Sequence, residues 1–161
     1  MDLGLKNRVA LITGGSQGIG RAAAMELARE GVKVAICARG LEALEAAANE
    51  IRLATGSEVL AVQADVTKVA DIKKFVRTTA RRFGRIDILV NNGVSFRVVD
   101  NWEELTDEDW QYHINSKVMG YLRCVREVMP YMRKRRWGRI INIAGVAARA
   151  TSSPSTAGAT N

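Results

Sequence analysis

A glycine-rich segment at residues 13–20 carries the clearest chemical signal in this sequence of 161 residues. An apolar run at 9–12 precedes it, and a helix-forming run at 21–29 follows it. Glycines adopt backbone angles that side chains resist, and they let an anion approach the bare amides at the positive end of a helix. The segment therefore predicts a phosphate-binding turn between a strand and a helix. Its spacing is looser than the G-x-G-x-x-G fingerprint, so a purely structural glycine turn remains the alternative.

The elements that must position this turn alternate along the chain. Short runs rich in Val, Ile and Leu are typical of strands covered on both faces, and they predict strands at 9–12, 33–38, 59–63, 86–90 and 139–143. The longer patterns between them predict helices at 21–29, 41–54, 69–83 and 109–135. Pro130 is expected to bend or end the last helix early. The alternation predicts a single α/β domain over residues 1–161, with a doubly wound parallel sheet of five strands.

The composition is that of an ordinary globular protein, with 47% hydrophobic and 25% charged residues. No apolar run reaches about 18 residues, the length of a membrane span, and the N-terminus has no leader pattern. A cytoplasmic protein without a membrane partner is therefore expected. Cys37 and Cys124 lack the spacing of metal or redox motifs, and His113 is the only histidine, so no metal site is predicted.

The formal net charge is +7, and a basic run at 133–136 precedes Trp137. Such a run is compatible with nucleic-acid binding. It also lies at the end of a predicted helix, where cations complement the helix dipole and face water. We favour the second interpretation and predict no nucleic-acid partner.

Five motifs, in order along the chain, resemble the short-chain dehydrogenase/reductase (SDR) family. After the glycine turn come Asp65-Val66 behind the third strand, and Asn91-Asn92-Gly93 behind the fourth, where Gly93-Val94 replaces the usual Ala-Gly. Asn115 matches the catalytic-helix asparagine, and residues 138–143 resemble the family's fifth strand. The resemblance implies an NAD(P)-binding Rossmann fold and hydride transfer between a small-molecule carbonyl and an alcohol.

The implied cofactor would lie at the carboxyl ends of the strands. The residues expected to hold its pyrophosphate are Gly14, Ser16, Gln17, Gly18, Ile19 and Gly20. Asp65 is expected to reach the adenine, with Val66 supplying backbone polarity and Asn91 belonging to the same site. An aspartate at the end of a strand also caps turns, which is the alternative for Asp65.

Cofactor choice depends on the end of the second strand, where NAD enzymes place an acid that accepts from the ribose 2′-hydroxyl. Arg39 stands there, with no acid beside it. A guanidinium pairs with a 2′-phosphate and stacks on adenine, so NADP(H) is favoured over NAD(H). A solvated arginine at a strand end is the alternative.

The catalytic groups implied by the resemblance are absent from this sequence. The family uses Tyr-x-x-x-Lys, in which the lysine lowers a tyrosine pKa of about 10, and a serine about a dozen residues earlier. No Tyr-x-x-x-Lys occurs here; the two positions fall on Ala157 and Asn161, and the serine position falls on Ala144 or Gly145. The hydroxyls considered as replacements are those of Ser152, Ser153, Ser155, Thr156 and Thr160. Asn115 is the remaining catalytic candidate, with bracing of buried backbone as its alternative role.

The resemblance also implies about 90 further residues that cover the sheet. The run Ile140, Ile141 and Ile143 is then expected to form an edge strand with an incompletely covered face. We therefore expect a fragment of a longer reductase of about 250 residues, open to homo-oligomer formation at full length. Whether this chain is an enzyme stays undecided: an NADP(H)-dependent oxidoreductase, a non-catalytic NADP(H)-binding protein and an interaction module all remain open.

Overall fold

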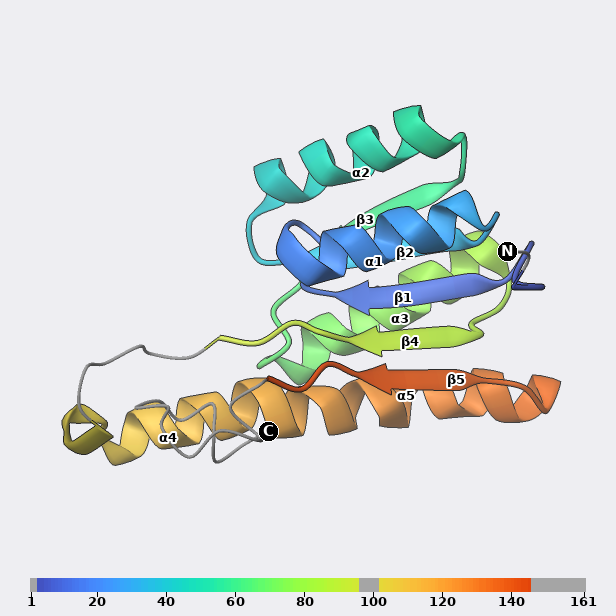
Figure 1. Ribbon diagram of the computed structural model, residues 1–161. Coiled ribbons are helices and arrows are strands. Elements are labelled where there is room, and N and C mark those ends of the chain that lie inside the picture. The colour runs from blue at the N-terminus through green and yellow to red at the C-terminus, as the bar shows by residue number, and fades with distance from the viewer. Residues whose placement is uncertain (1–2, 96–101, 146–161) are drawn as a thin grey trace.

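Five parallel strands form a single sheet in this computed structural model, which describes residues 3–95 and 102–145 (Figure 1). The order across the sheet is β3-β2-β1-β4-β5. The strands are β1 (Val9–Thr13), β2 (Lys33–Ala38), β3 (Val59–Gln63), β4 (Ile88–Asn91) and β5 (Arg139–Asn142). The order changes direction at β1, with β2 and β3 on one side and β4 and β5 on the other, which confirms the predicted doubly wound α/β fold.

Helices cover both faces of the sheet, as parallel strands require. They are α1 (Gly18–Arg29), α2 (Leu41–Thr55), α3 (Val69–Phe83), the 3-10 turn η1 (Trp102–Glu104), α4 (Asp107–Ile114), the π-helical turn η2 (Asn115–Met119) and α5 (Gly120–Arg135). Helices α1 and α2 pack on one face, and α3 and α5 pack on the other (Figure 1).

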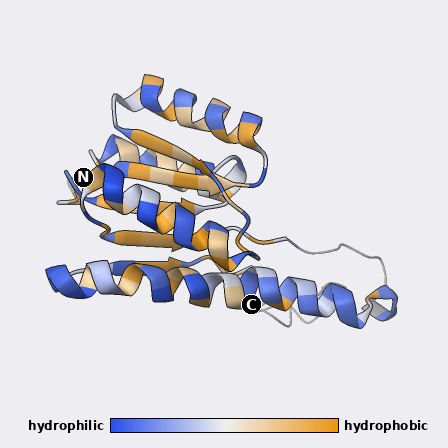
Figure 2. Cartoon of the chain, turned by 180° about the vertical axis from the view of Figure 1, so that it is seen from behind, coloured by the Kyte–Doolittle hydropathy of each residue, from blue (hydrophilic) through white to orange (hydrophobic). Residues whose placement is uncertain are grey.

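The alternation of side chains along each strand divides the core into two layers. In β1, Val9 and Leu11 contact the α3–α5 layer, whereas Ala10 and Ile12 contact the α1–α2 layer. All four side chains are fully buried. Figure 2 shows the same division in hydropathy, with apolar strands between helices whose outer faces are polar. Within the described ranges, no helix combines the length and the apolar character needed to cross a membrane.

The helix predicted at 109–135 differs in two ways from the observed structure. It begins at Asp107, and it is interrupted by the wider turn of η2 before α5 begins. Of the two effects expected of Pro130, a bend or an early end of the helix, the early end is wrong, because α5 continues to Arg135. Proline removes one helical N–H, while the buried side chains Cys124, Val128 and Met132 hold α5 on the sheet on both sides of it.

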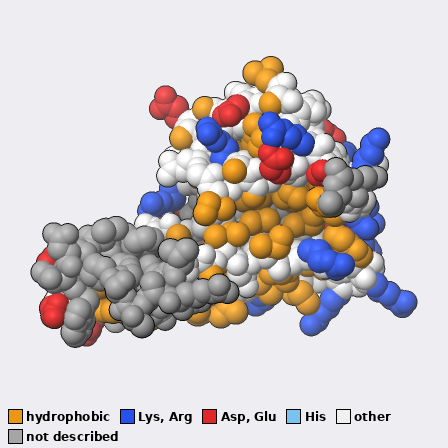
Figure 3. Space-filling model, viewed as in Figure 1, with side chains coloured by type: hydrophobic (Ala, Val, Ile, Leu, Met, Phe, Trp, Pro, Cys, Tyr) orange, Lys and Arg blue, Asp and Glu red, His pale blue; other side chains and the backbone are white. Residues whose placement is uncertain are grey.

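β5 lies at the edge of the sheet, and all four of its residues are exposed. Ile140 and Ile141 expose 37% and 46% of their surface. Figure 3 shows hydrophobic side chains gathered on the face that also carries α1, over the part of the sheet that no helix covers. The predicted edge strand with an incompletely covered face is therefore present in the described structure.

Candidate functional site

A cavity of about 520 Å³ opens at the carboxyl ends of the strands. This volume lies within the range of about 300–1,000 Å³ that is typical of small-ligand pockets. The wall is formed by the β1–α1 turn, by the segments that follow β2, β3 and β4, and by side chains from α4 and η2. The crevice thus lies where an open parallel sheet binds ligands.

The glycine turn forms part of the wall of this cavity. Gly14, Ser16, Gln17, Gly18 and Ile19 all line it. α1 begins at Gly18, and its N-cap residue Gln17 makes no side-chain hydrogen bond to the first turn. The amides at the positive end of α1 therefore face the cavity without a side-chain cap, as an anion site requires.

Asn92 holds the turn in this shape from the neighbouring strand. Its Nδ2 donates to the backbone oxygens of Thr13 at 3.0 Å and Gly14 at 3.1 Å. Its own amide, like that of Gly93, donates to the Thr13 hydroxyl, at 2.9 and 2.8 Å respectively. The end of β4 is thereby tied to the end of β1.

These contacts explain why two positions of the turn require glycine. A Cβ on Gly14 would lie 2.8 Å from Asn92 Nδ2, and a Cβ on Gly20 would lie 2.2 Å from the Gly14 oxygen. Gly14 also has φ +67°, in the left-handed region. Gly20 is buried and does not line the cavity, so its role in the described structure is close packing of α1 on the turn.

Arg39 and Tyr112 meet on another part of the cavity wall. Arg39 follows β2, Tyr112 comes from α4, and Arg39 Nη1 donates to the Tyr112 hydroxyl oxygen at 3.2 Å. Both residues line the cavity. Among the described lining residues, Arg39 is the one cation and Asp65 the one acid.

Asp65 and Val66, which follow β3, also line the cavity. The Asp65 carboxylate accepts from the Thr67 amide at 2.9 Å and the Thr67 hydroxyl at 2.8 Å. It thus caps the turn that follows β3, which is the alternative role raised by the sequence. A Cβ on Gly120 would lie 3.3 Å from the Val66 oxygen, so the start of α5 packs directly against this segment.

Asn91 and Asn115 do not line the cavity. Asn91 is fully buried in β4 and donates from Nδ2 to Asn142 Oδ1 on β5 at 2.9 Å. Its Oδ1 accepts no hydrogen bond from the described residues. Asn115 is half-buried in η2 and accepts from Arg123 Nη1 at 2.6 Å; the same guanidinium also donates to the Thr67 oxygen at 3.2 Å. Arg123 thus connects α5 to the loop that follows β3, and Asn115 holds the Arg123 guanidinium in place.

Two ionisable groups are buried beside the cavity wall. Burial lowers the pKa of Lys117 in η2 below its usual value. Burial, and next the charge of Lys117, lowers the pKa of His113 at the end of α4. Between them in sequence, the buried Ser116 lines the cavity and accepts from the Ser95 amide at 2.8 Å.

Sequence reasoning missed five polar lining residues, namely Thr67, Asn92, Ser95, Tyr112 and Ser116. The motif Asn91-Asn92-Gly93 contained the signal for Asn92, because adjacent residues at a strand end face opposite sides and only one of the two asparagines faces the turn. Tyr112 and Ser116 had no comparable signal. The alternative hydroxyls at 152–160, and the positions Ala157 and Asn161, lie outside the described residues.

The residues present match the chemistry of a dinucleotide. The cavity wall contains both an uncapped helix N-terminus, suited to a pyrophosphate, and the Arg39 guanidinium. The glycine turn that separates β1 from α1 also leaves no room for a Cβ at Gly14 or Gly20. This arrangement can hold two phosphate-bearing parts of one extended ligand.

Comparison with known proteins agrees with this geometry. Residues 8–157 match the sequence profile of the family described as short chain dehydrogenase. A 3-oxoacyl-[acyl-carrier-protein] reductase from Synechocystis sp. is 41% identical over 145 residues, which cover 89% of this chain and 58% of that protein. The chain thus spans little more than half the length of this curated relative.

Solved structures of similar proteins contain either cofactor. The crystal structure of L-sorbose reductase from Gluconobacter frateurii, complexed with NADPH and L-sorbose, matches with a TM-score of 0.90 at 34% identity, over 99% of this chain and 61% of that one. An NAD+-bound xylitol dehydrogenase matches with a TM-score of 0.88 at 29% identity, over 95% of this chain and 58% of that one. The fold alone therefore does not decide which cofactor is bound.

Proposed function

Since this chain belongs to the short-chain dehydrogenase family, we propose that its cavity binds NADP(H) in preference to NAD(H). The chain would then be the cofactor-binding part of an oxidoreductase that interconverts a carbonyl and an alcohol. Turnover by these 161 residues alone is doubtful, because the sequence has no Tyr-x-x-x-Lys. The bound cofactor would supply the hydride.

The observation that carries the proposal is the position of Arg39. It lines the cavity directly after β2, where an acid would accept from a ribose 2′-hydroxyl. Among the described residues Arg39 makes no ion pair, so its charge is not neutralised by a neighbour. A 2′-phosphate gains a charge-assisted hydrogen bond at this point, and a 2′-hydroxyl gains much less.

The other cavity residues bind parts that both cofactors share. The first turn of α1 would hold the pyrophosphate through backbone amides. Asp65 and Val66 would bound the adenine, with the Asp65 carboxylate held by Thr67. Asn91 and Asn115, set back from the cavity, would support the ends of β4 and α5 rather than contact the cofactor.

Substitution of Arg39 tests the proposal. We expect Arg39→Ala to weaken NADPH binding by about 10- to 100-fold, the value of a charged hydrogen bond, and to leave NADH binding nearly unchanged. The measurement is the Kd of each cofactor, from fluorescence titration or calorimetry. Arg81→Ala removes one exposed positive charge from the C-terminal end of α3 and serves as the matched control. Equal losses for the two cofactors in Arg39→Ala would refute the preference.

The second candidate function is a non-catalytic NADP(H)-binding protein. The absent Tyr-x-x-x-Lys favours it. NADPH oxidation with a carbonyl panel separates the two candidates, and the panel includes a 3-oxoacyl thioester because the Synechocystis relative is named a 3-oxoacyl reductase. Tight NADPH binding without consumption of any carbonyl would support the non-catalytic role.

A further inference from the structure

We propose that Tyr112 is a positioning residue that orients the Arg39 guanidinium and thereby sharpens selection of the phosphorylated cofactor. The inference rests on the proposed function of the cavity. It adds a residue from a distant part of the chain to the discrimination between NADP(H) and NAD(H).

The contact joins two walls of the same cavity. Arg39 lies in the turn between β2 and α2, and Tyr112 lies in α4, 73 residues later. Arg39 Nη1 lies 3.2 Å from the Tyr112 hydroxyl oxygen, and both side chains line the cavity. A ligand that occupies this part of the cavity therefore meets the pair.

The backbone at Arg39 is held independently of its side chain. Gln63, the last residue of β3, donates from Nε2 to the Arg39 oxygen at 2.8 Å. The long arginine side chain still has several rotatable bonds, whose immobilisation costs conformational entropy. The hydrogen bond to Tyr112 restrains the Arg39 side chain and removes part of that cost before a ligand binds.

Tyr112 is itself on a well-anchored helix. α4 begins with a reciprocal capping box, in which the Thr106 hydroxyl accepts from the Asp109 amide at 3.2 Å and Asp109 Oδ2 accepts from the Thr106 amide at 3.1 Å. The adjacent His113 is fully buried, which sets the rotation of the helix about its axis. The phenol is therefore presented to Arg39 by a rigid element.

A phenol suits this task because its hydroxyl oxygen accepts a hydrogen bond without carrying a formal negative charge. A carboxylate in its place would orient the guanidinium but would also neutralise the charge that a 2′-phosphate needs. The bond to Tyr112 uses one of the five N–H donors of the guanidinium, so the rest stay available for a phosphate. The Arg39 guanidinium is thus oriented and still keeps its full positive charge.

Removal of the hydroxyl alone tests this role. In Tyr112→Phe we expect the Kd of NADPH, and of the fragment 2′,5′-ADP, to rise about 3- to 10-fold, which is the net value of one hydrogen bond. The Kd of NADH and of 5′-ADP should stay unchanged. Tyr131→Phe, a partly buried tyrosine on α5 away from the cavity, is the matched control.

The double variant Arg39→Ala/Tyr112→Phe distinguishes positioning from a general structural role. If Tyr112 acts through Arg39, the double variant should bind NADPH no more weakly than Arg39→Ala alone. Additive losses, or equal losses of NADPH and NADH in Tyr112→Phe, would overturn the inference. A loss of NADPH preference in Arg39→Ala but not in Tyr112→Phe would overturn it while leaving the proposed function intact. A wild-type chain without NADPH preference would refute both. Circular dichroism and thermal unfolding verify that each variant is folded.

Discussion

At the scale of single residues, burial changes the charge behaviour of several groups around the cavity. Burial raises the pKa of Cys124 and of Tyr121 to about 12, and it also raises the pKa of Cys37. These groups are therefore uncharged at neutral pH, and both thiols are poor nucleophiles. For His113 burial acts in the opposite direction and favours the neutral imidazole.

The lowered pKa of His113 predicts a pH dependence of stability. In the unfolded chain this histidine titrates near its ordinary pKa of about 6.5, so the unfolded state takes up a proton first as the pH falls. Its contribution to stability is complete above about pH 6.5 and is lost as the pH falls through that value toward the lower pKa of the folded state. We expect the free energy of unfolding, from urea titrations at pH 7.5, 6.5 and 5.5, to decrease across this series. His113→Gln should flatten the decrease; parallel curves for the variant and wild type would assign it to other groups.

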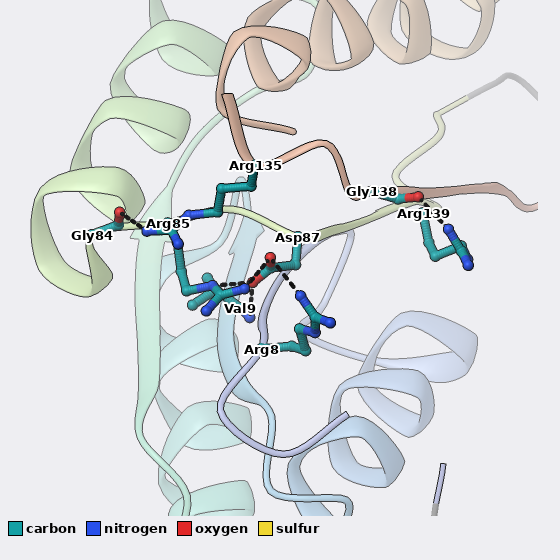
Figure 4. A network of polar contacts seen from close by, with 8 residues as sticks. All are labelled: Arg8, Val9, Gly84, Arg85, Asp87, Arg135, Gly138 and Arg139. Atoms are coloured by element: carbon teal, nitrogen blue, oxygen red, sulfur yellow. Dashed lines mark hydrogen bonds and ion pairs between the residues drawn. The ribbon is translucent and has the colours of Figure 1, made fainter. Parts of the chain in front are cut away.

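At the scale of elements, a buried carboxylate joins two neighbouring strands at the end of the sheet opposite the cavity. Asp87, fully buried just before β4, accepts from the Val9 amide at 2.9 Å. Arg85 donates to both its oxygens at 2.7 Å, and Arg8 lies 3.5 Å from Oδ1 (Figure 4). The start of β1 is thereby tied to the start of β4.

Loss of the Asp87 carboxylate should lower the stability of the fold. We expect Asp87→Ala to lower the free energy of unfolding by about 3 kcal/mol, because it leaves a buried amide and two guanidinium groups without their acceptor. Asp87→Asn keeps one acceptor oxygen and should lower the free energy of unfolding by less than Asp87→Ala does. Glu26→Ala removes an exposed ion pair with Arg29 and should stay within about 0.5 kcal/mol of wild type. A denaturant titration that finds Asp87→Ala no less stable than Glu26→Ala would contradict the assignment.

At the scale of the whole molecule, the exposed edge of the sheet is the feature that governs solution behaviour. β5 has no partner on its outer side among the described residues, and Ile140 and Ile141 are exposed there. The relatives to which this chain is similar are longer, since it spans 58% of the Synechocystis protein. We propose that in a longer protein further residues cover this edge.

This view predicts that the 161-residue chain associates when it is studied alone. An open apolar edge strand pairs readily with other chains, and a charged side chain on it blocks such pairing. We therefore expect concentration-dependent association in size-exclusion chromatography, and a larger monomer fraction in Ile141→Lys. Leu53→Lys, which changes an exposed leucine on α2, should leave association unchanged. A compact monomer at all concentrations would argue against the proposal of a longer protein.

Local patterns in the sequence predicted the order of the main elements and the position of the site. The bounds predicted for β2, β3 and α3 match the structure, and the glycine turn lies at the carboxyl ends of the strands as expected. These features follow from local patterns, namely hydrophobic periodicity and turn chemistry, which act over a few residues. Such patterns are readable without knowledge of the rest of the chain.

Only the tertiary structure decided which side chains meet. Asn92 rather than Asn91 faces the glycine turn, because the strand register directs Asn91 toward Asn142. The meeting of Arg39 with Tyr112 depends on the strand order and on the rotation of α4, and Asp87 reaches Val9 only because β4 pairs with β1. Contacts between positions about 70 to 80 residues apart arise from packing of whole elements, and no local pattern in the sequence encodes them.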